Sequence, residues 1–181
     1  MKAKLLKKFE EIYGNSEDAK VYFAPGRVNL IGEHTDYNGG HVLPCALTIG
    51  TYVVVKKRQD KKLRFYSLNY EEHGISEGTL GDLKYRRSNG WTNYPIGILW
   101  TYLKKGYRIP NGFDLLLYGN IPSGAGLGTS ASIGVALMWW WWIPPERAST
   151  PTPSKHCTGC SPDASSMSPA TPPPWQEMWH C

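Results

Sequence analysis

Cysteines, long apolar runs and blocks of basic residues are all scarce in this sequence. Cys45 is the only cysteine before residue 157, which excludes a disulfide framework from most of the chain and indicates a reducing compartment. No segment approaches the ~20 consecutive apolar residues of a transmembrane helix. The N-terminus also lacks the unbroken apolar core of a secretory signal. We therefore expect a cytoplasmic protein with no membrane partner.

The charge is mildly positive and unevenly distributed. Residues 1–138 carry 18 Lys and Arg against 12 Asp and Glu, a net charge of +6, whereas residues 139–181 carry 2 against 3, a net charge of −1. The body lacks the basic stripe that nucleic-acid binding usually requires. These charges suit a small anionic ligand such as a nucleotide, and we expect no nucleic-acid partner.

Hydrophobic periodicity predicts a body of mixed α and β structure. The patterns of residues 5–13, 96–103 and 130–138 are typical of helices. Thr48–Arg58 and Lys62–Leu68 alternate as strands do, and we expect them to pair with each other across the short turn between them. Gly112–Asn120 is a continuous apolar run of strand length.

The character of the chain changes after Met138. Residues 139–181 hold 9 of the 14 prolines and 6 of the 8 tryptophans, with no hydrophobic period. We interpret this tail as disordered sequence that was never selected to fold, produced by a frame shift or gene-model error near codon 138. A zinc site is the alternative, with the candidate ligands His156, Cys157, Cys160, His180 and Cys181. Only Cys157 and Cys160 have the spacing of a zinc-binding pair.

The stretch "APGRVNLIGEHTDYNGG" (Ala24–Gly40) gathers polar side chains between Pro-Gly and Gly-Gly pairs, which we interpret as turns at its two ends. Its Glu33, His34 and Asp36 follow a glycine at which the backbone can bend sharply. Carboxylates and an imidazole can bind the vicinal hydroxyls of a sugar. A plain polar surface loop is an equal alternative. A metal site at these three residues is a weaker one, because no second histidine lies at ligand spacing.

The stretch "PSGAGLGTSAS" (Pro122–Ser132) follows an apolar strand and opens a helix. Its glycines let backbone N–H groups approach a phosphate, and the helix N-terminus adds its dipole. Ser130 could direct its hydroxyl at Mg²⁺. The spacing fits neither the Walker A motif nor the dinucleotide-binding fingerprint. A glycine-rich turn with Thr129 or Ser130 as helix cap is the alternative.

Together these stretches resemble one family. "PGRVNLIGEHTDYNGG" resembles the galactokinase signature, and "GNIPSGAGLGTSAS" resembles the ATP-binding motif of the wider GHMP small-molecule kinases. "FYSLN" and "GWTNYPIGILW" are also similar to galactokinase segments. The resemblance covers residues 1–138 and implies an α+β fold, the two-layer N-terminal domain of GHMP kinases, here truncated and followed by the unrelated tail 139–181.

The resemblance implies a role for each matching residue. Arg27 would stabilise the transferring phosphoryl group, and galactose would bind at Glu33, His34, Thr35 and Asp36. ATP would bind at Ser67, Trp91, Gly124, Ala125, Gly126, Leu127, Gly128, Thr129 and Ser130, with Ser130 also facing Mg²⁺. The implied reaction is ATP plus galactose giving galactose 1-phosphate plus ADP.

The family's later motif does not appear. Similar kinases carry a Mg²⁺-binding Glu and a catalytic Asp further on, the latter in a motif resembling "GxxCGxMDQ", whereas Glu146 and Asp163 stand in unrelated contexts here and receive no role. We therefore expect a monomer without useful kinase activity. A non-catalytic galactose- and ATP-binding regulator, or a related sugar kinase such as N-acetylgalactosamine kinase, is the alternative.

Overall fold

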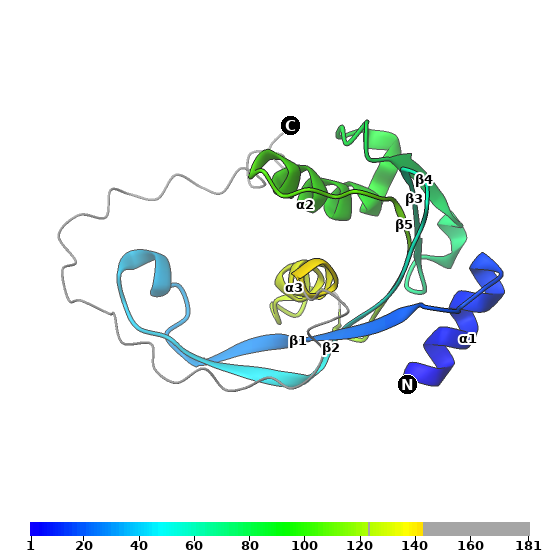
Figure 1. Ribbon diagram of the computed structural model, residues 1–181. Helices are drawn as coiled ribbons and strands as arrows, with labels where there is room; N and C mark the ends of the chain where they lie inside the picture. Colours follow the sequence, from blue (N-terminus) through cyan, green and yellow to red (C-terminus); the bar gives the residue numbers. More distant parts are fainter. Residues whose placement is uncertain (123, 143–181) are drawn as a thin grey trace. The chain divides into compact units, whose positions relative to one another are not determined.

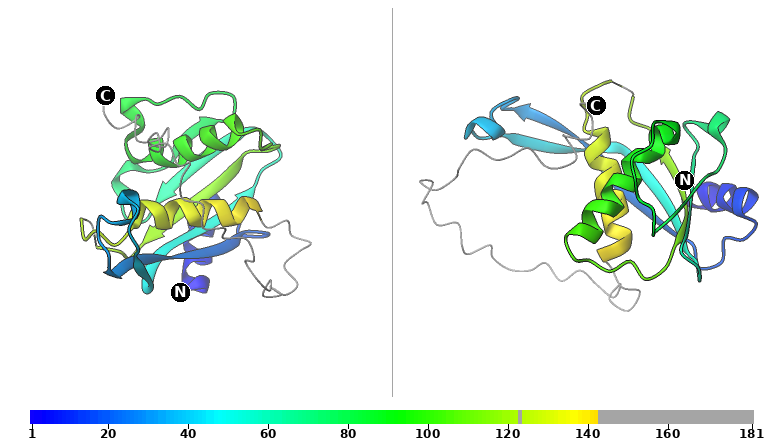
Figure 2. Two further views of the ribbon diagram at one scale, coloured as in Figure 1. Left: turned by 90° about the vertical axis from the view of Figure 1, so that its left-hand side faces the viewer. Right: turned by 90° about the horizontal axis from the view of Figure 1, so that it is seen from above.

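The computed structural model of the protein describes residues 1–122 and 124–142, except for the side chains of residues 36 and 139–142. The segment 143–181, with its zinc candidates and the disorder expected of it, lies outside the described residues. Within the described part, five strands form one sheet in the order β1-β2-β5-β3-β4. Helix α1 lies on one face of this sheet, and α2 and α3 lie on the opposite face (Figures 1 and 2).

The elements follow one another as short, regular pieces. The strands are β1 Lys20–Ile31, β2 Leu43–Lys57, β3 Lys62–Ser67, β4 Ser76–Thr79 and β5 Phe113–Gly119. The α-helices are α1 Lys2–Tyr13, α2 Asn93–Lys104 and α3 Thr129–Trp142, and the 3₁₀ turns are η1 Asp36–Asn38, η2 Glu71–His73 and η3 Arg87–Thr92. None of the described helices is both long and apolar enough to cross a bilayer.

Strand β5 occupies the middle of the sheet because both of its faces are apolar. Leu115 and Leu117 belong to the core beneath α2 and α3, whereas Leu116 packs with Val54 of β2 and Phe9 of α1. A strand that is apolar on both faces needs packing partners on both, and the helices on the two sides of the sheet supply them. It pairs antiparallel with β2 and parallel with β3.

The predicted pairing of Thr48–Arg58 with Lys62–Leu68 is wrong, because β5 lies between β2 and β3. Strand β2 instead forms a long hairpin with β1, which the sequence pattern conceals because a Pro25–Gly26 pair is typical of a turn. These two residues lie inside β1, where the register with β2 shifts between Pro25 and Arg27. Proline and glycine fit a strand at such a bulge.

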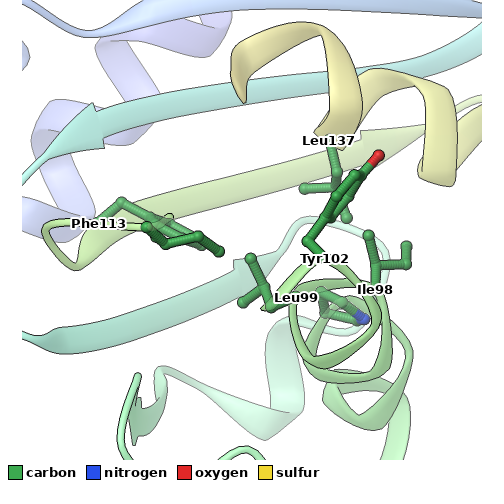
Figure 3. A pocket seen from close by; sticks show the side chains of 7 residues that line it. Ile98, Leu99, Tyr102, Phe113 and Leu137 are labelled. Atoms are coloured by element: carbon green, nitrogen blue, oxygen red, sulfur yellow. The ribbon is translucent and has the colours of Figure 1, made fainter. Parts of the chain in front are cut away.

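A small cavity lies between α2, α3 and β5 (Figure 3). Its volume is about 20 Å³, and its walls are apolar: Pro95, Ile98, Leu99, Tyr102, Ile109, Phe113 and Leu137. A space of this size holds about one water molecule and offers it no array of polar partners. This cavity is therefore a packing gap, too small for a sugar or a nucleotide.

One buried carboxylate, that of Asp114, holds the start of β5 in place. Asp114 accepts hydrogen bonds from Arg64 Nε at 2.6 Å and from Arg58 Nη1 at 3.0 Å, and its side chain is only 6% exposed. The Arg64 guanidinium also lies 4.8 Å above the ring of Tyr13. The Tyr13 hydroxyl donates to the Leu115 carbonyl at 2.8 Å, and burial raises the pKa of this phenol. The cluster therefore links β3, β5, α1 and the residue that follows β2.

We expect Asp114→Asn to lower the free energy of unfolding by about 3 kcal/mol, since it leaves the half-buried Arg64 guanidinium without its carboxylate and Arg58 with Asp60 alone. Urea denaturation of the two proteins measures the difference. Glu11→Gln is the matched control, because it removes only the exposed Lys8–Glu11 pair and we expect no measurable change. A loss below about 1 kcal/mol for Asp114→Asn would show that solvent replaces the carboxylate.

Candidate functional site

Two asparagines fix the place where β5 ends and the glycine loop begins. Asn69 holds Gly119 from both sides: its Oδ1 accepts from the Gly119 N–H and its Nδ2 donates to the Gly119 carbonyl, both at 2.8 Å. Asn120 Oδ1 accepts from the Gly50 N–H at 2.7 Å, while the Asn120 N–H donates to the Gly50 carbonyl at 3.1 Å. The loop therefore leaves the sheet from a fixed point.

The glycine loop leads into α3 through left-handed backbone. Gly124, Gly126 and Gly128 have φ values of 73°, 68° and 72°, which residues with a Cβ adopt only with strain. Helix α3 begins at Thr129, and the Ser130 side chain at its first turn is exposed. The arrangement places backbone N–H groups and a helix N-terminus beside open space, as an anion site requires.

A phenol on α2 holds the first turn of α3. The Tyr94 hydroxyl donates to the Ser130 carbonyl at 2.5 Å. Burial raises the pKa of Tyr94, so the group stays protonated and remains a donor across the physiological range. The sequence analysis did not single out this residue. Only its place in the similarity of "GWTNYPIGILW" pointed toward the site.

The first polar stretch meets the glycine loop at Arg27. The Arg27 N–H donates to the Leu127 carbonyl at 2.9 Å, so strand β1 and the loop are joined directly. A Cβ added to Gly26 would lie 2.9 Å from the same carbonyl oxygen, which explains the glycine at this position. The exposed Arg27 side chain begins beside Gly128, 3.7 Å from where a Cβ would stand. Two segments about 100 residues apart in the sequence thus form one site.

Thr35 organises the turn that closes the β1–β2 hairpin (Figure 1). Its hydroxyl lies 2.5 Å from the Gly32 carbonyl and 3.0 Å from the His41 carbonyl, and its own carbonyl accepts from the Gly40 N–H at 2.7 Å. Gly32 has φ 93°, and a Cβ there would lie 2.4 Å from the His41 oxygen. The Thr35 hydroxyl is therefore engaged within the turn itself.

The turn presents its remaining polar groups outward. His34 has φ 60°, an uncommon conformation for a residue other than glycine, and its Nδ1 contacts the Tyr37 hydroxyl. Asn38 Nδ2 donates to the His34 carbonyl at 2.8 Å. The Glu33 side chain is exposed nearby in the chain, while the side chain of Asp36 lies outside the described part. Backbone strain held by local hydrogen bonds is a common feature of functional sites.

The other two predicted nucleotide-binding residues are Ser67, at the end of β3, and Trp91, in η3 just before α2. Ser67 is buried, and its Oγ accepts from the Asn69 N–H at 3.2 Å. Trp91 stacks on Tyr70 with the ring centroids 6.5 Å apart, and Tyr70 in turn donates its N–H to the Ser67 carbonyl at 3.2 Å. The Trp91 indole N–H is buried without a hydrogen-bond partner among the described residues.

The described side chains form no group of three or more His, Cys, Asp or Glu residues that could hold a metal ion. The interpretation of His34, Glu33 and Asp36 as ligands depends on the Asp36 side chain, which lies outside that set. The Ser130 hydroxyl is a hard oxygen donor at the open helix terminus. It fits the single-oxygen contribution that a phosphate-bound Mg²⁺ takes from a protein.

Two family models match the segments of the chain that meet at the candidate site. Residues 7–57 match the model described as "Galactokinase galactose-binding signature", and residues 93–140 match the "GHMP kinases N terminal domain". The chain is 56% identical over 131 residues to the galactokinase of Fusobacterium nucleatum, which covers 72% of this chain and 34% of that protein. The matched residues of the chain are therefore similar to the N-terminal part of galactokinases.

Other galactokinases show the same extent of similarity. The Bacillus subtilis galactokinase is 54% identical over 125 residues, which is 69% of this chain and 32% of that protein. The chain thus spans about a third of the length of the curated galactokinases that it matches. The match therefore concerns the N-terminal part of a galactokinase.

A solved structure gives the same result for the fold. Lactococcus lactis galactokinase complexed with galactose superposes with a TM-score of 0.73 at 38% identity, covering 78% of this chain and 38% of that one. The Methanococcus jannaschii mevalonate kinase shares the fold, with a TM-score of 0.55 at 22% identity. The α+β fold of the GHMP-kinase type, predicted from sequence, is therefore confirmed.

We expect Gly32→Ala to open the hairpin turn, because its Cβ would overlap the His41 carbonyl in addition to straining the backbone. Gly39→Ala is the matched control: φ is 76° there, yet a Cβ would meet nothing within 4 Å. Amide exchange at Gly40, whose N–H is bonded to Thr35, measures the outcome. Exchange should become fast in Gly32→Ala and stay slow in Gly39→Ala. Equal protection in both would mean that the His41 carbonyl moves aside without loss of the turn.

Proposed function

We propose that residues 1–138 bind galactose at the hairpin turn and the phosphates of ATP at the glycine loop. These are two parts of the site for the reaction ATP plus galactose giving galactose 1-phosphate plus ADP. Glu33, His34 and Asp36 contact the sugar hydroxyls, and Thr35 supports the turn that carries them. The proposal extends to a cytoplasmic location, which suits the unpaired, exposed Cys45 among the described residues.

The hydrogen bond between the Arg27 N–H and the Leu127 carbonyl carries this proposal. It puts the strand of the sugar-binding signature against the loop of the phosphate-binding signature. A phosphoryl acceptor and a phosphoryl donor must lie close together for transfer, and positioning supplies much of the catalysis. Similarity in one motif alone would support only one of the two ligands.

Each group has a physical role in the proposed reaction. Backbone N–H groups of the glycine loop neutralise phosphate oxygens. The Ser130 hydroxyl would give one oxygen ligand to Mg²⁺, which would offset charge on the phosphates. The Arg27 guanidinium stabilises charge on the phosphoryl group during transfer. Ser67 and Trp91 line the nucleotide base pocket, where an indole offers a flat apolar face.

No aspartate of this 181-residue sequence lies in a motif like the one that carries the family's catalytic Asp. That group would orient the sugar hydroxyl and accept its proton. Binding and positioning groups act without it, yet the proton step has no acceptor of the expected kind. We therefore expect this 181-residue chain alone to bind both ligands and not to turn them over.

Calorimetric titration of the 181-residue chain with galactose, and separately with MgATP, tests the proposal. We expect one-to-one binding of each. A coupled assay for ADP should stay at background when both ligands are present. Failure of both titrations with folded protein would overturn the proposal. Turnover comparable to that of a complete galactokinase would overturn the expected inactivity.

We expect Glu33→Gln to weaken galactose binding by about 10- to 100-fold, because a hydrogen bond to a charged group contributes roughly 1.5–3 kcal/mol. MgATP affinity should stay unchanged, since Glu33 lies in the hairpin turn and not in the glycine loop. Glu17→Gln is the matched control, an exposed carboxylate outside both motifs that should alter neither affinity. Galactose binding equal to that of the parent chain would remove Glu33 from the sugar site.

A further inference from the structure

Two hydroxyls are fully buried beside the glycine loop. Ser132 lies one turn into α3 and is 2% exposed, and Thr51 lies on β2 and is 0% exposed. Buried hydroxyls require hydrogen-bond partners, because an unsatisfied one costs roughly 1–3 kcal/mol. An apolar pair of similar volume would fill the same space without this requirement. The hydrogen bonds of these two hydroxyls therefore indicate which segments of the chain they hold together.

The Ser132 hydroxyl is inserted between two strands. Its oxygen accepts from the Thr51 N–H at 3.1 Å, and its proton is donated to the Ala24 carbonyl at 2.7 Å. Ala24 and Thr51 are directly opposite each other in the β1–β2 ladder. The helix side chain thus bridges backbone groups of β1 and β2.

The Thr51 hydroxyl completes the arrangement. Its Oγ1 lies 2.9 Å from Ser132 Oγ. A serine hydroxyl has one proton, and the Ala24 carbonyl takes it, so the Thr51 hydroxyl is the donor in this contact. The Ser132 oxygen then accepts two hydrogen bonds and donates one. Replacing either hydroxyl removes a partner from a site that water cannot reach.

This anchor fixes the same two segments that form the candidate site. Ala24 lies three residues before Arg27 on β1, and the Ser132 N–H donates to the Gly128 carbonyl at 2.9 Å. The Arg27–Leu127 bond joins the segments at one place, and the Ser132–Ala24 bond joins them again on the buried side. Two bonds fix an orientation that a single bond would leave free to rotate.

We propose that Ser132 and Thr51 are positioning residues for the phosphate site. They hold the glycine loop at a set distance and angle from the strand that carries Arg27, and neither touches a ligand. This inference rests on the proposed function, because it assigns the loop the task of binding phosphates. It differs from simple packing in that the hydroxyl, rather than the volume of the side chain, is the required feature.

Thr51→Val and Thr51→Ser separate the hydroxyl from the volume. Valine keeps the shape of threonine and removes the hydroxyl, whereas serine keeps the hydroxyl and loses the methyl group. We expect Thr51→Val and Ser132→Ala to raise the Kd for MgATP about tenfold in the 181-residue chain, the loss of one buried hydrogen bond. Thr51→Ser should leave this Kd within about twofold. The Kd for galactose should stay constant in all three.

Thr101→Val is the matched control, since it removes a hydroxyl that donates to the Gly97 carbonyl at 2.8 Å within α2. It should leave the Kd for MgATP unchanged. If Thr51→Val and Thr51→Ser weaken MgATP binding equally, the role is packing and the inference is wrong. Unchanged MgATP affinity in folded Thr51→Val and Ser132→Ala overturns it as well.

Amide exchange at Arg27 gives a readout that needs no ligand. Its N–H is bonded to the Leu127 carbonyl, so displacement of the loop exposes it. We expect exchange at least tenfold faster in Thr51→Val and unchanged in Thr51→Ser. If the parent chain binds no MgATP, the proposed function fails, whereas the exchange rates still decide whether these hydroxyls position the loop. Equal rates in all variants would overturn the inference.

Discussion

The hydrogen bond from the Arg27 N–H to the Leu127 carbonyl brings the two halves of the site together. It demands close approach of β1 to the glycine loop, and therefore a residue without a Cβ at Gly26. The bulge that follows Pro25 lets β1 meet the loop while the rest of the strand stays paired with β2. The hairpin beyond the bulge carries the turn that is proposed to bind the sugar.

Much of the fold could be predicted from the sequence because its apolar patterns are strong. The periodicity of α1 and α2 and the unbroken run of β5 appear as predicted. Strand pairing could not be derived, since adjacent strands in the chain favour a hairpin and only the two-faced burial of β5 places it between β2 and β3. A Pro25–Gly26 pair predicts a turn, although the same residues also fit a strand at a bulge. The local sequence does not show that the bulge contacts a distant loop.

The candidate site residues follow from their motifs, whereas the groups that hold their backbone do not. Glu33, His34 and Arg27 belong to stretches with unusual composition. Ser132 and Tyr94 look like ordinary members of helices, and their roles depend on partners 108 and 36 residues away in the sequence. Ser132 is the third hydroxyl residue in the first turn of α3, and nothing in the sequence separates it from the exposed Ser130.

The charges of the described residues are arranged in opposite ways at the two ends of the sheet. Near the start of β5, Asp114 is buried and surrounded by Arg58 and Arg64, so its charge is used to hold strands together. At the other end, Arg27 and Glu33 are exposed, and neither forms an ion pair within the described residues. Exposed charges carried by backbone that is itself constrained contribute little to stability but stay oriented for a ligand. The stability of the fold and the proposed chemistry of the site thus depend on different charged groups, and we expect a substitution at Arg27 or Glu33 to affect folding little.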